Sequence, residues 1–262
     1  MKIKSAILLF CVLLFAGTFS VTAQDFKEVD KTFKIDKDGR VTVDTYKGEI
    51  KIETWDKAEV HVYARMVPDD GGGFWNTSPE KQLDHVDVDI DASSSSVRIK
   101  SDYRKSNSWF GNNTRAFVYY KIQMPKTARL DVKDYKSESK VSGLQAPIKF
   151  ETYKGEVTIS DLTGWIDLET YKGEVDVRFV KLTDDCRFET YKGEINVSLP
   201  KSTGFSIDTD FGRRTDFYSS FDIDKRSYKH KRRDYNIRED VNGGGPQLRF
   251  SSTKGRIELV ER

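Results

Sequence analysis

Two short stretches rich in Gly, Ser and Asn contain the first residues of this chain that could bind a ligand. One stretch holds Phe74 and Trp75, and the other holds Trp109 and Phe110. Aromatic side chains in such loops can stack on sugar rings or anchor a protein partner, so we interpret these four residues as a candidate binding set. The alternative is that both loops fold back and their aromatic side chains cover an open end of the core.

A third stretch is a basic run between positions 225 and 233. Its candidate ligand-binding residues are Lys225, Arg226, Lys229, Lys231, Arg232 and Arg233. A run of this kind can bind an anionic glycan, lipid headgroups or a phosphate-rich polymer. The alternative is a solvated loop whose charge is balanced by neighbouring Asp and Glu residues.

A fourth stretch contains residue types that bind metal ions. His85 follows Asp84, and the residues Asp87, Asp89 and Asp91 alternate with apolar ones. Alternate residues of a strand share one face. A calcium loop, however, needs a turn that wraps its ligands around the ion, and this stretch contains no Gly. We therefore predict an exposed acidic strand and no metal site.

Enzyme motifs are missing from the sequence. It contains no Gly-x-Ser-x-Gly, His-Glu-x-x-His, Gly-x-Gly-x-x-Gly or phosphate-binding loop. The Ser-x-x-Lys matches at 137–140 and 198–201 lack companion motifs, so we predict no catalytic residue and no cofactor. The enzyme alternative is a β-helix polysaccharide lyase or hydrolase, which would need carboxylates with different pKa values.

A repeated phrase supplies the elements that must position these residues. It reads Glu-Thr-Tyr-Lys-Gly-Glu and is followed by an apolar, a polar and an apolar residue. Close copies occupy 43–52, 150–159, 168–177 and 188–197, and weaker copies occupy 132–141, 207–216 and 250–259. From position 137 to position 212 the copies recur every 18 to 20 residues, which is typical of a solenoid. The period is too short for a strand-helix-strand unit.

Each copy predicts two short strands around a tight Lys-Gly turn, because apolar and polar residues alternate on both sides of the glycine. Glycine suits a turn that requires positive φ, as we predict for Gly173. The turn glycines are Gly48, Gly155, Gly173, Gly193, Gly212 and Gly255.

Stacked copies should align equivalent residues in columns. The inward columns are Phe150, Leu168 and Phe188, and Val157, Val175 and Ile195; the outward ones are Tyr153, Tyr171 and Tyr191, Lys154, Lys172 and Lys192, and Glu156, Glu174 and Glu194. The outward columns form either a solvated face whose charges neutralise one another or a flat ligand-binding face.

The N-terminus reads as a secretory signal peptide over residues 1–23, with a basic start, an apolar run at 6–19 and small residues before Gln24. Export to the periplasm, the cell surface or the medium is expected. Residues 24–262 then form one all-β solenoid domain, with no membrane-spanning segment. We predict irregular rungs at 24–130, regular rungs at 131–217, an insertion at about 219–245 and a capping rung at 247–262.

Charge and cysteine content narrow the possible partners. Without Lys2 and Lys4 the mature chain has as many basic residues as the 42 acidic ones. This balance and the export signal argue against a nucleic-acid partner. Cys186 is the one cysteine after residue 23, so we expect no internal disulfide and a thiol in the core.

The glycine-centred rungs resemble the bacterial putative-adhesin family of unknown function, which is related to head GIN domain proteins. The resemblance rests on the stretches 45–55, 120–125, 195–200, 245–250 and 254–259. It implies an exported β-solenoid and brings no catalytic residues with it. We expect a non-enzymatic binding protein for a glycan or an envelope protein. The alternative is a structural or assembly module of the envelope; the oligomeric state stays open.

Overall fold

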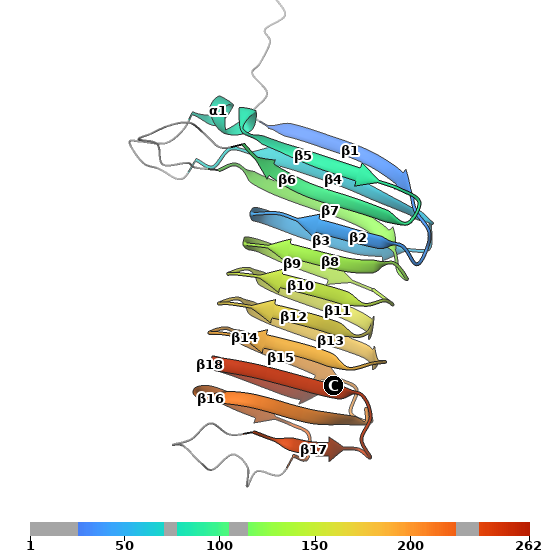
Figure 1. Cartoon of the computed structure of the whole chain (residues 1–262), viewed down its shortest axis with the longest axis vertical. Helices are drawn as coiled ribbons and strands as arrows, with labels where there is room; N and C mark the ends of the chain where they lie inside the picture. Colours follow the sequence, from blue (N-terminus) through green and yellow to red (C-terminus); the bar gives the residue numbers. More distant parts are fainter. Residues whose placement is uncertain (1–25, 71–77, 105–114, 224–235) are drawn as a thin grey trace, which may run out of the picture.

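The computed structural model describes residues 26–70, 78–104, 115–223 and 236–262 of the protein. These residues form eighteen β-strands and one short helix, α1 (Pro79–Asp84). The strands stack into a flattened solenoid in which each regular rung contributes one strand to each of two opposite faces (Figure 1). The all-β solenoid predicted from the repeat is confirmed.

The first face contains the strand that precedes the turn in each repeated copy. Its strands are, in spatial order, β5 (Val86–Ala92), β6 (Ser96–Tyr103), β2 (Arg40–Asp44), β8 (Arg129–Asp134), β10 (Ile148–Thr152), β12 (Ile166–Thr170), β14 (Cys186–Thr190), the first halves of β18 (Gln247–Glu261) and β16 (Phe205–Ser219), and β17 (Arg238–Val241).

The second face contains the strand that follows the turn. Its strands are, in spatial order, β1 (Lys27–Lys34), β4 (Glu59–Val67), β7 (Phe117–Pro125), β3 (Lys47–Trp55), β9 (Lys136–Ser142), β11 (Glu156–Gly164), β13 (Glu174–Leu182), β15 (Glu194–Leu199), and the second halves of β18 and β16. The regular rungs pair in parallel and in register on both faces.

The last rung does not cap the stack, so that prediction was wrong. The first half of β18 pairs with β14 and with β16, and its second half pairs with β15 and β16. The C-terminal strand therefore lies between two rungs that precede it in the chain (Figure 1). The rung of β16 ends the stack, and the described part of the predicted insertion adds β17 antiparallel to it.

The N-terminal copy is also inserted into the stack. Strand β3 pairs with β7 on one side and with β9 on the other, and Gly48 lies in register with Val118 and Ser137. The copy at 43–52 therefore belongs to the regular part of the stack, although it is far from that part in sequence. Antiparallel strands β1, β4 and β5 complete the opposite end.

The core consists of the inward columns that the alternation predicted. Phe150, Leu168, Phe188 and Phe250 are in register and fully buried, and the rings of Phe188 and Phe250 stack with their centroids 5.0 Å apart. Burying side chains of this size contributes about 1.5–3 kcal/mol each. The stacking of rungs thus creates a core that no single rung could form.

Candidate functional site

Five tyrosines form a continuous stack along the turn edge of the solenoid, and we call them the tyrosine ladder. They are Tyr46, Tyr135, Tyr153, Tyr171 and Tyr191. Neighbouring ring centroids lie 4.6–4.9 Å apart, and the ring planes differ by only 2–6°. The spacing equals that of hydrogen-bonded strands, because the tyrosine takes the same place in each rung. The predicted column of three tyrosines is therefore confirmed and extended to five.

Hydroxyl groups beneath the ladder fix the turns that carry it. The backbone N–H of Gly155, Gly173 and Gly193 donates to the Oγ1 of the threonine three residues earlier, at 3.0, 2.8 and 2.7 Å respectively. These threonines are buried. Each turn thus has its own internal hydrogen bond, which holds the tyrosine between threonine and glycine at a constant angle.

Asp134 replaces threonine in the rung of Tyr135. Its carboxylate accepts hydrogen bonds from the N–H and Oγ of Ser137, from the N–H of Lys136 and from Oγ1 of Thr152. Burial raises the pKa of Asp134, and these hydrogen bonds oppose the rise. The Asp134 side chain therefore closes its turn as threonine does in the other rungs, but unlike threonine it can titrate.

Close approach of backbones, rather than positive φ, requires glycine in three of these turns. Gly173 does not have the positive φ that we predicted. A Cβ atom on it would instead lie 2.4 Å from the carbonyl oxygen of Gly155, and one on Gly193 would lie 2.3 Å from that of Gly173. Gly48 and Gly255 combine close approach with φ of +137° and +132°.

Gly212 does not belong to the glycine column, so its assignment to that column was wrong. Thr215 is the residue of β16 in register with Gly255. Between Phe211 and Arg214 the strand is bulged, and Gly212 and Arg213 lie opposite Thr253. The pairing of Phe211 with Ser252 already places Gly212 two positions before the glycine column, and the bulge adds one further residue.

The ladder ends differently on its two sides. At Tyr46 it meets Tyr103 edge to face, and the guanidinium of Arg115 lies 4.3 Å from the Tyr46 ring centroid. At Tyr191 the next rung places Thr253 in the tyrosine position, as the hydrogen bond from Lys254 N to Tyr191 O shows. The outward face of the Tyr191 ring therefore has no aromatic neighbour in the next rung, and Tyr191 is 49% exposed.

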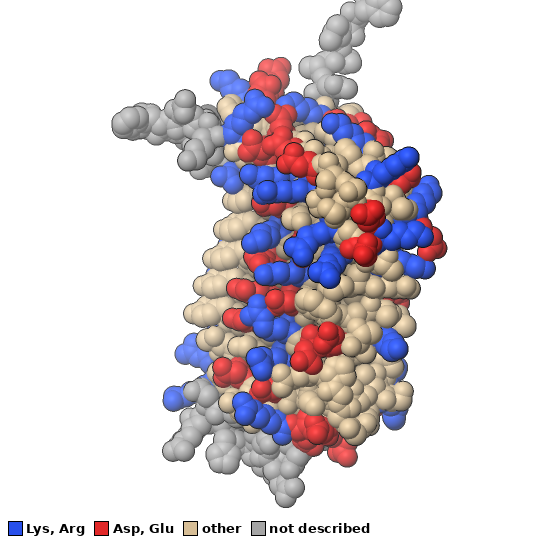
Figure 2. Space-filling model, turned by 45° about the vertical axis from the view of Figure 1, so that its right-hand side comes forward, with Lys and Arg blue, Asp and Glu red and all other residues tan. Residues whose placement is uncertain are grey.

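An acidic groove of about 400 Å³ follows one flank of the ladder. It is lined by the rings of Tyr153, Tyr171 and Tyr191 and by carboxylates of the preceding strands, namely Glu151, Glu169 and Glu189. Figure 2 shows a densely charged strip beside an uncharged edge. The ladder is thus an aromatic ridge with ionic groups beside it.

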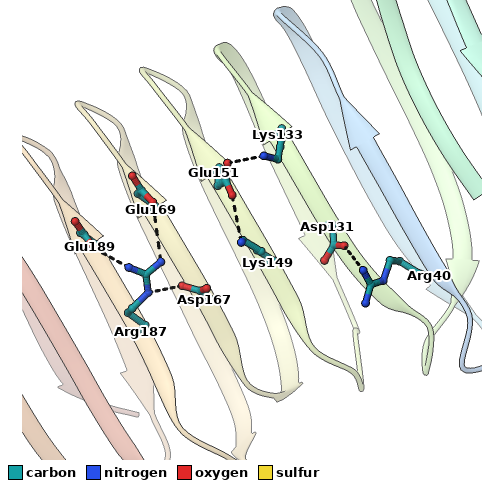
Figure 3. A network of polar contacts seen from close by, with 9 residues as sticks. All are labelled: Arg40, Asp131, Lys133, Lys149, Glu151, Asp167, Glu169, Arg187 and Glu189. Atoms are coloured by element: carbon teal, nitrogen blue, oxygen red, sulfur yellow. Dashed lines mark hydrogen bonds and ion pairs between the residues drawn. The ribbon is translucent and has the colours of Figure 1, made fainter.

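Ion pairs cross the rungs of the first face next to this groove. Arg187 on β14 donates to Asp167 of β12 and to Glu189 of its own strand, both at 2.7 Å (Figure 3). Lys133 and Lys149 contact opposite oxygens of Glu151 at 3.1 and 3.4 Å. Burial acts to raise the pKa of Glu151, but the two lysines hold it below its ordinary value. Because these groups are partly exposed, each pair contributes at most about 1 kcal/mol.

The binding residues predicted from the loops lie outside the described residues. They are Phe74, Trp75, Trp109, Phe110, Lys225, Arg226, Lys229, Lys231, Arg232 and Arg233. Those predictions stay predictions.

Asp87 and His85 of the predicted acidic stretch contact neighbouring residues. Asp87 pairs with Lys27 and Arg104, and Nδ1 of His85 lies beside the carbonyl oxygen of Lys81. Within the described ranges, no group of three His, Cys, Asp or Glu could hold a metal ion. Cys186 is a buried free thiol, as predicted.

A basic hollow at the end of the ladder was not predicted from the sequence. It measures about 530 Å³ and lies against Tyr191. Its charged residues are Lys172, Lys192, Arg213, Arg214 and Lys254. Three of them come from Lys-Gly turns, a signal that the sequence contained. The two arginines come from the bulge of β16, which the repeat did not predict.

The chain belongs to the family described as Toastrack DUF4097, whose model matches residues 20–259. This agrees with the stack of repeated rungs. No curated protein matches the chain in sequence.

Several solved structures are similar to the chain over most of its length, at low sequence identity. A "putative cell adhesion protein" of Clostridium sporogenes has a TM-score of 0.47 and 12% identity, with 90% of this chain and 100% of that chain covered. A "putative adhesin" of Bacteroides fragilis has a TM-score of 0.41 and 12% identity over 90% and 97%. A "putative lipid binding protein" of Parabacteroides distasonis has a TM-score of 0.27 and 12% identity over 88% and 96%. In the described part of this chain, no helix is long and apolar enough to cross a membrane.

Proposed function

We propose that this chain is an exported, non-enzymatic binding protein of the bacterial envelope, and that the tyrosine ladder is the surface that contacts a glycan or an envelope protein. The observation that carries this proposal is the ladder itself. Five parallel rings on a rigid turn edge form an aromatic ridge that is pre-organised at strand spacing. Such a surface loses little conformational entropy on binding.

Carbohydrate and protein surfaces both suit an aromatic ridge with ionic flanks. The rings within the ladder cover one another's faces, so a partner along the ridge meets their edges and hydroxyl groups. A sugar ring can place its C–H bonds against these edges, and its hydroxyl groups can reach the carboxylates of Glu151, Glu169 and Glu189 in the adjacent groove. Tyrosine is also enriched at protein interfaces because it joins a large apolar face to a polar tip. The ridge thus supports recognition of a repetitive partner over several rungs.

Catalysis fits the groove less well. Asp134, whose pKa is raised, and Glu151, whose pKa is lowered, both line it, and such a split is typical of catalytic pairs. However, both oxygens of Asp134 already accept hydrogen bonds from its own turn and from Thr152. A carboxyl engaged in this way is not free to transfer a proton to a substrate.

Assembly through strand edges also fits less well. The edge strand β1 carries Lys27, Glu28, Asp30, Lys31 and Lys34 among its eight residues, and charged edge strands disfavour pairing with another chain. We therefore keep the assembly role as an outcome of the test.

The test is a glycan-array screen of residues 24–262 beside light scattering over a concentration series. The variant Tyr153→Thr/Tyr171→Thr interrupts the ladder. Threonine is the replacement because the same column already contains a threonine at position 253. The matched control Tyr119→Thr/Tyr218→Thr removes two exposed tyrosines outside the ladder. Binding by a monomer that disappears only in the ladder variant supports the proposal. Binding equal in both variants contradicts it, and particle mass that grows with concentration without glycan binding favours assembly.

The aromatic loops provide a second arm of the same screen. If Trp75→Ala/Trp109→Ala abolishes binding while the ladder variant retains it, the contact surface lies in the loops and the ladder is a structural feature.

A further inference from the structure

The basic hollow beside Tyr191 differs in charge from the rest of the turn edge. Its described lining consists of Tyr171, Tyr191, Gly212, Thr253 and five cationic side chains, with no carboxylate among these residues. The acidic groove on the other flank contains four carboxyl groups, those of Asp134 and three glutamates, and one cation, Lys133. The ladder therefore separates an acidic flank from a basic end.

Among the described residues, the cations of the hollow form no ion pair with a carboxylate. Elsewhere on the surface, Lys133, Arg187 and Arg256 each contact a carboxylate. No carboxylate of the described residues forms an ion pair with Arg213 or Arg214, and both are exposed. Five positive charges around one hollow create a potential that attracts an anion.

Position 253 is a threonine where the preceding rungs have a tyrosine, and this leaves a space one rung deep beside Tyr191 on the aromatic ridge. Tyr171 covers the inward face of the Tyr191 ring at 4.8 Å. On the outward face, the ladder would continue through position 253, which is a threonine. The following rung presents Gly212, which has no side chain, and the bulge there directs two successive arginines to the same place. A ring entering this space would continue the stack.

The positions of the turn lysines also leave the outward face of Tyr191 uncovered. The Nζ atoms of Lys154 and Lys172 lie over the rings of Tyr153 and Tyr171, at 5.4 and 5.1 Å from their centroids. Among the described residues, Lys192 makes no such contact with Tyr191. The final ring of the ladder is thus the one whose face is left for another group.

We propose that this hollow binds one unit of an acidic polysaccharide, with the sugar ring stacked on Tyr191 and its anionic group held by Arg213, Arg214 and Lys254. The inference rests on the proposed glycan-binding function and names the class of glycan. Arginine binds carboxylate and sulfate groups with two parallel hydrogen bonds, and a hollow of about 530 Å³ is of the size that small ligands occupy. The anionic group is a carboxylate or a sulfate.

The test measures binding of four probes to residues 24–262 at low and at physiological salt. The probes are an oligogalacturonate, its methyl-esterified neutral form, a dextran sulfate oligosaccharide and a neutral dextran oligosaccharide. Preference for oligogalacturonate or for the sulfated oligosaccharide identifies the anionic group. Affinity should fall as salt rises, because the charges lie at the surface.

Two variants test the residues. Arg213→Gln/Arg214→Gln should weaken binding of the acidic probe by about tenfold or more, as expected for lost charge-assisted hydrogen bonds. The control Arg178→Gln/Arg249→Gln makes the same change in net charge away from the hollow and should retain affinity within about twofold. Tyr191→Thr should weaken binding of the acidic probe by about fivefold or more, because it removes the stacking face. All five positions are exposed, so these variants should fold, as a thermal melt would verify.

The outcomes separate this inference from the proposed function. Equal losses in the variant and the control would show attraction by net charge alone and would overturn the inference. Neutral probes that bind as well as acidic ones, with loss only in the ladder variant Tyr153→Thr/Tyr171→Thr, would overturn it and leave the proposed function standing. No binding of any probe would overturn it, while the array decides the proposed function.

Discussion

Replacing Gly173 with alanine tests how closely the rungs approach one another at the turns. The new Cβ atom would lie 2.4 Å from the Gly155 carbonyl oxygen and 2.6 Å from Oγ1 of Thr170. Carbon and oxygen atoms in contact normally lie roughly 1 Å further apart. Both neighbours are fixed, because one is backbone and the other accepts the N–H of Gly173 at 2.8 Å. The turn must therefore move.

The expected cost follows from these two contacts. Separating the turns overpacks a close-packed site, which costs about 1–3 kcal/mol, and the strained hydrogen bond adds about 1 kcal/mol. We expect Gly173→Ala to lower the free energy of unfolding by about 3 kcal/mol. For a domain of this size this corresponds to a fall in Tm of roughly 6–12 °C. The assay is thermal and urea unfolding followed by far-UV circular dichroism.

Two further glycines separate close approach from backbone conformation. Gly243 has φ of +87°, and no atom lies within 4 Å of the place that a Cβ atom would take, so Gly243→Ala should cost only roughly 1–2 kcal/mol. Gly255 has φ of +132°, and a Cβ atom there would lie 2.0 Å from the carbonyl oxygen of Gly193, so Gly255→Ala should be the most damaging. An unchanged Tm for Gly173→Ala, beside a clear fall for Gly243→Ala, would refute the close-approach argument.

Three further predictions concern the core, the buried acid and the thiol. Phe188→Ala should lower the free energy of unfolding by about 3–5 kcal/mol, whereas Arg187→Ala should lower it by less than about 1 kcal/mol because its ion pairs are exposed; equal losses would contradict the burial pattern, and urea unfolding measures both. The raised pKa of Asp134 means that the folded state holds this proton more tightly than the unfolded one, so the contribution is present below the unfolded pKa of about 3.9 and is lost as pH rises through the folded pKa. The stability of Asp134→Asn relative to the parent chain should therefore increase from pH 4 to pH 7 in unfolding experiments, and a difference independent of pH would contradict the shift. Burial raises the pKa of the Cys186 thiol to about 12, so a thiol reagent at pH 8 should label it in urea and not in the folded protein, and rapid labelling of the folded protein would contradict its burial.

The sequence predicted the columns of the fold because one period governs them all. Alternation around each Lys-Gly turn placed Phe150, Leu168 and Phe188 inside and Tyr153, Tyr171 and Tyr191 outside, and parallel in-register pairing does the rest. Register is strongly specified when one face of a strand is buried, because a slip of one residue would turn every side chain around. This is why residues that are distant in sequence could be aligned correctly.

The order of rungs could not be predicted in the same way. Parallel edges of all rungs offer similar hydrogen bonds, so sequence adjacency suggested that the last copy caps the stack. A signal is visible in retrospect. The copies with Lys47-Gly48 and Lys254-Gly255 keep the turn that fits between two neighbours, and both lie within the stack. The copy with the bulge at Gly212 lies at its end.

The candidate site was predicted in part, for a physical reason. A column of tyrosines follows from the repeat, but the hollow beside Tyr191 depends on which rung comes next. Only the insertion of β18 places Thr253 there, and only the bulge of β16 brings Arg213 and Arg214 to it. Departures from the repeat formed this hollow, and a pattern search discards such departures.

The most direct test of the central claim is a nuclear magnetic resonance titration of residues 24–262 with ¹³C-labelled tyrosine rings. The partner is the best ligand from the array, and single Tyr→Phe variants assign the signals. We expect the ring signals of Tyr153, Tyr171 and Tyr191 to shift with the same dissociation constant, while those of Tyr63 and Tyr119 stay in place. Saturable binding that leaves the three ladder signals unmoved would contradict the claim that the tyrosine ladder is the contact surface.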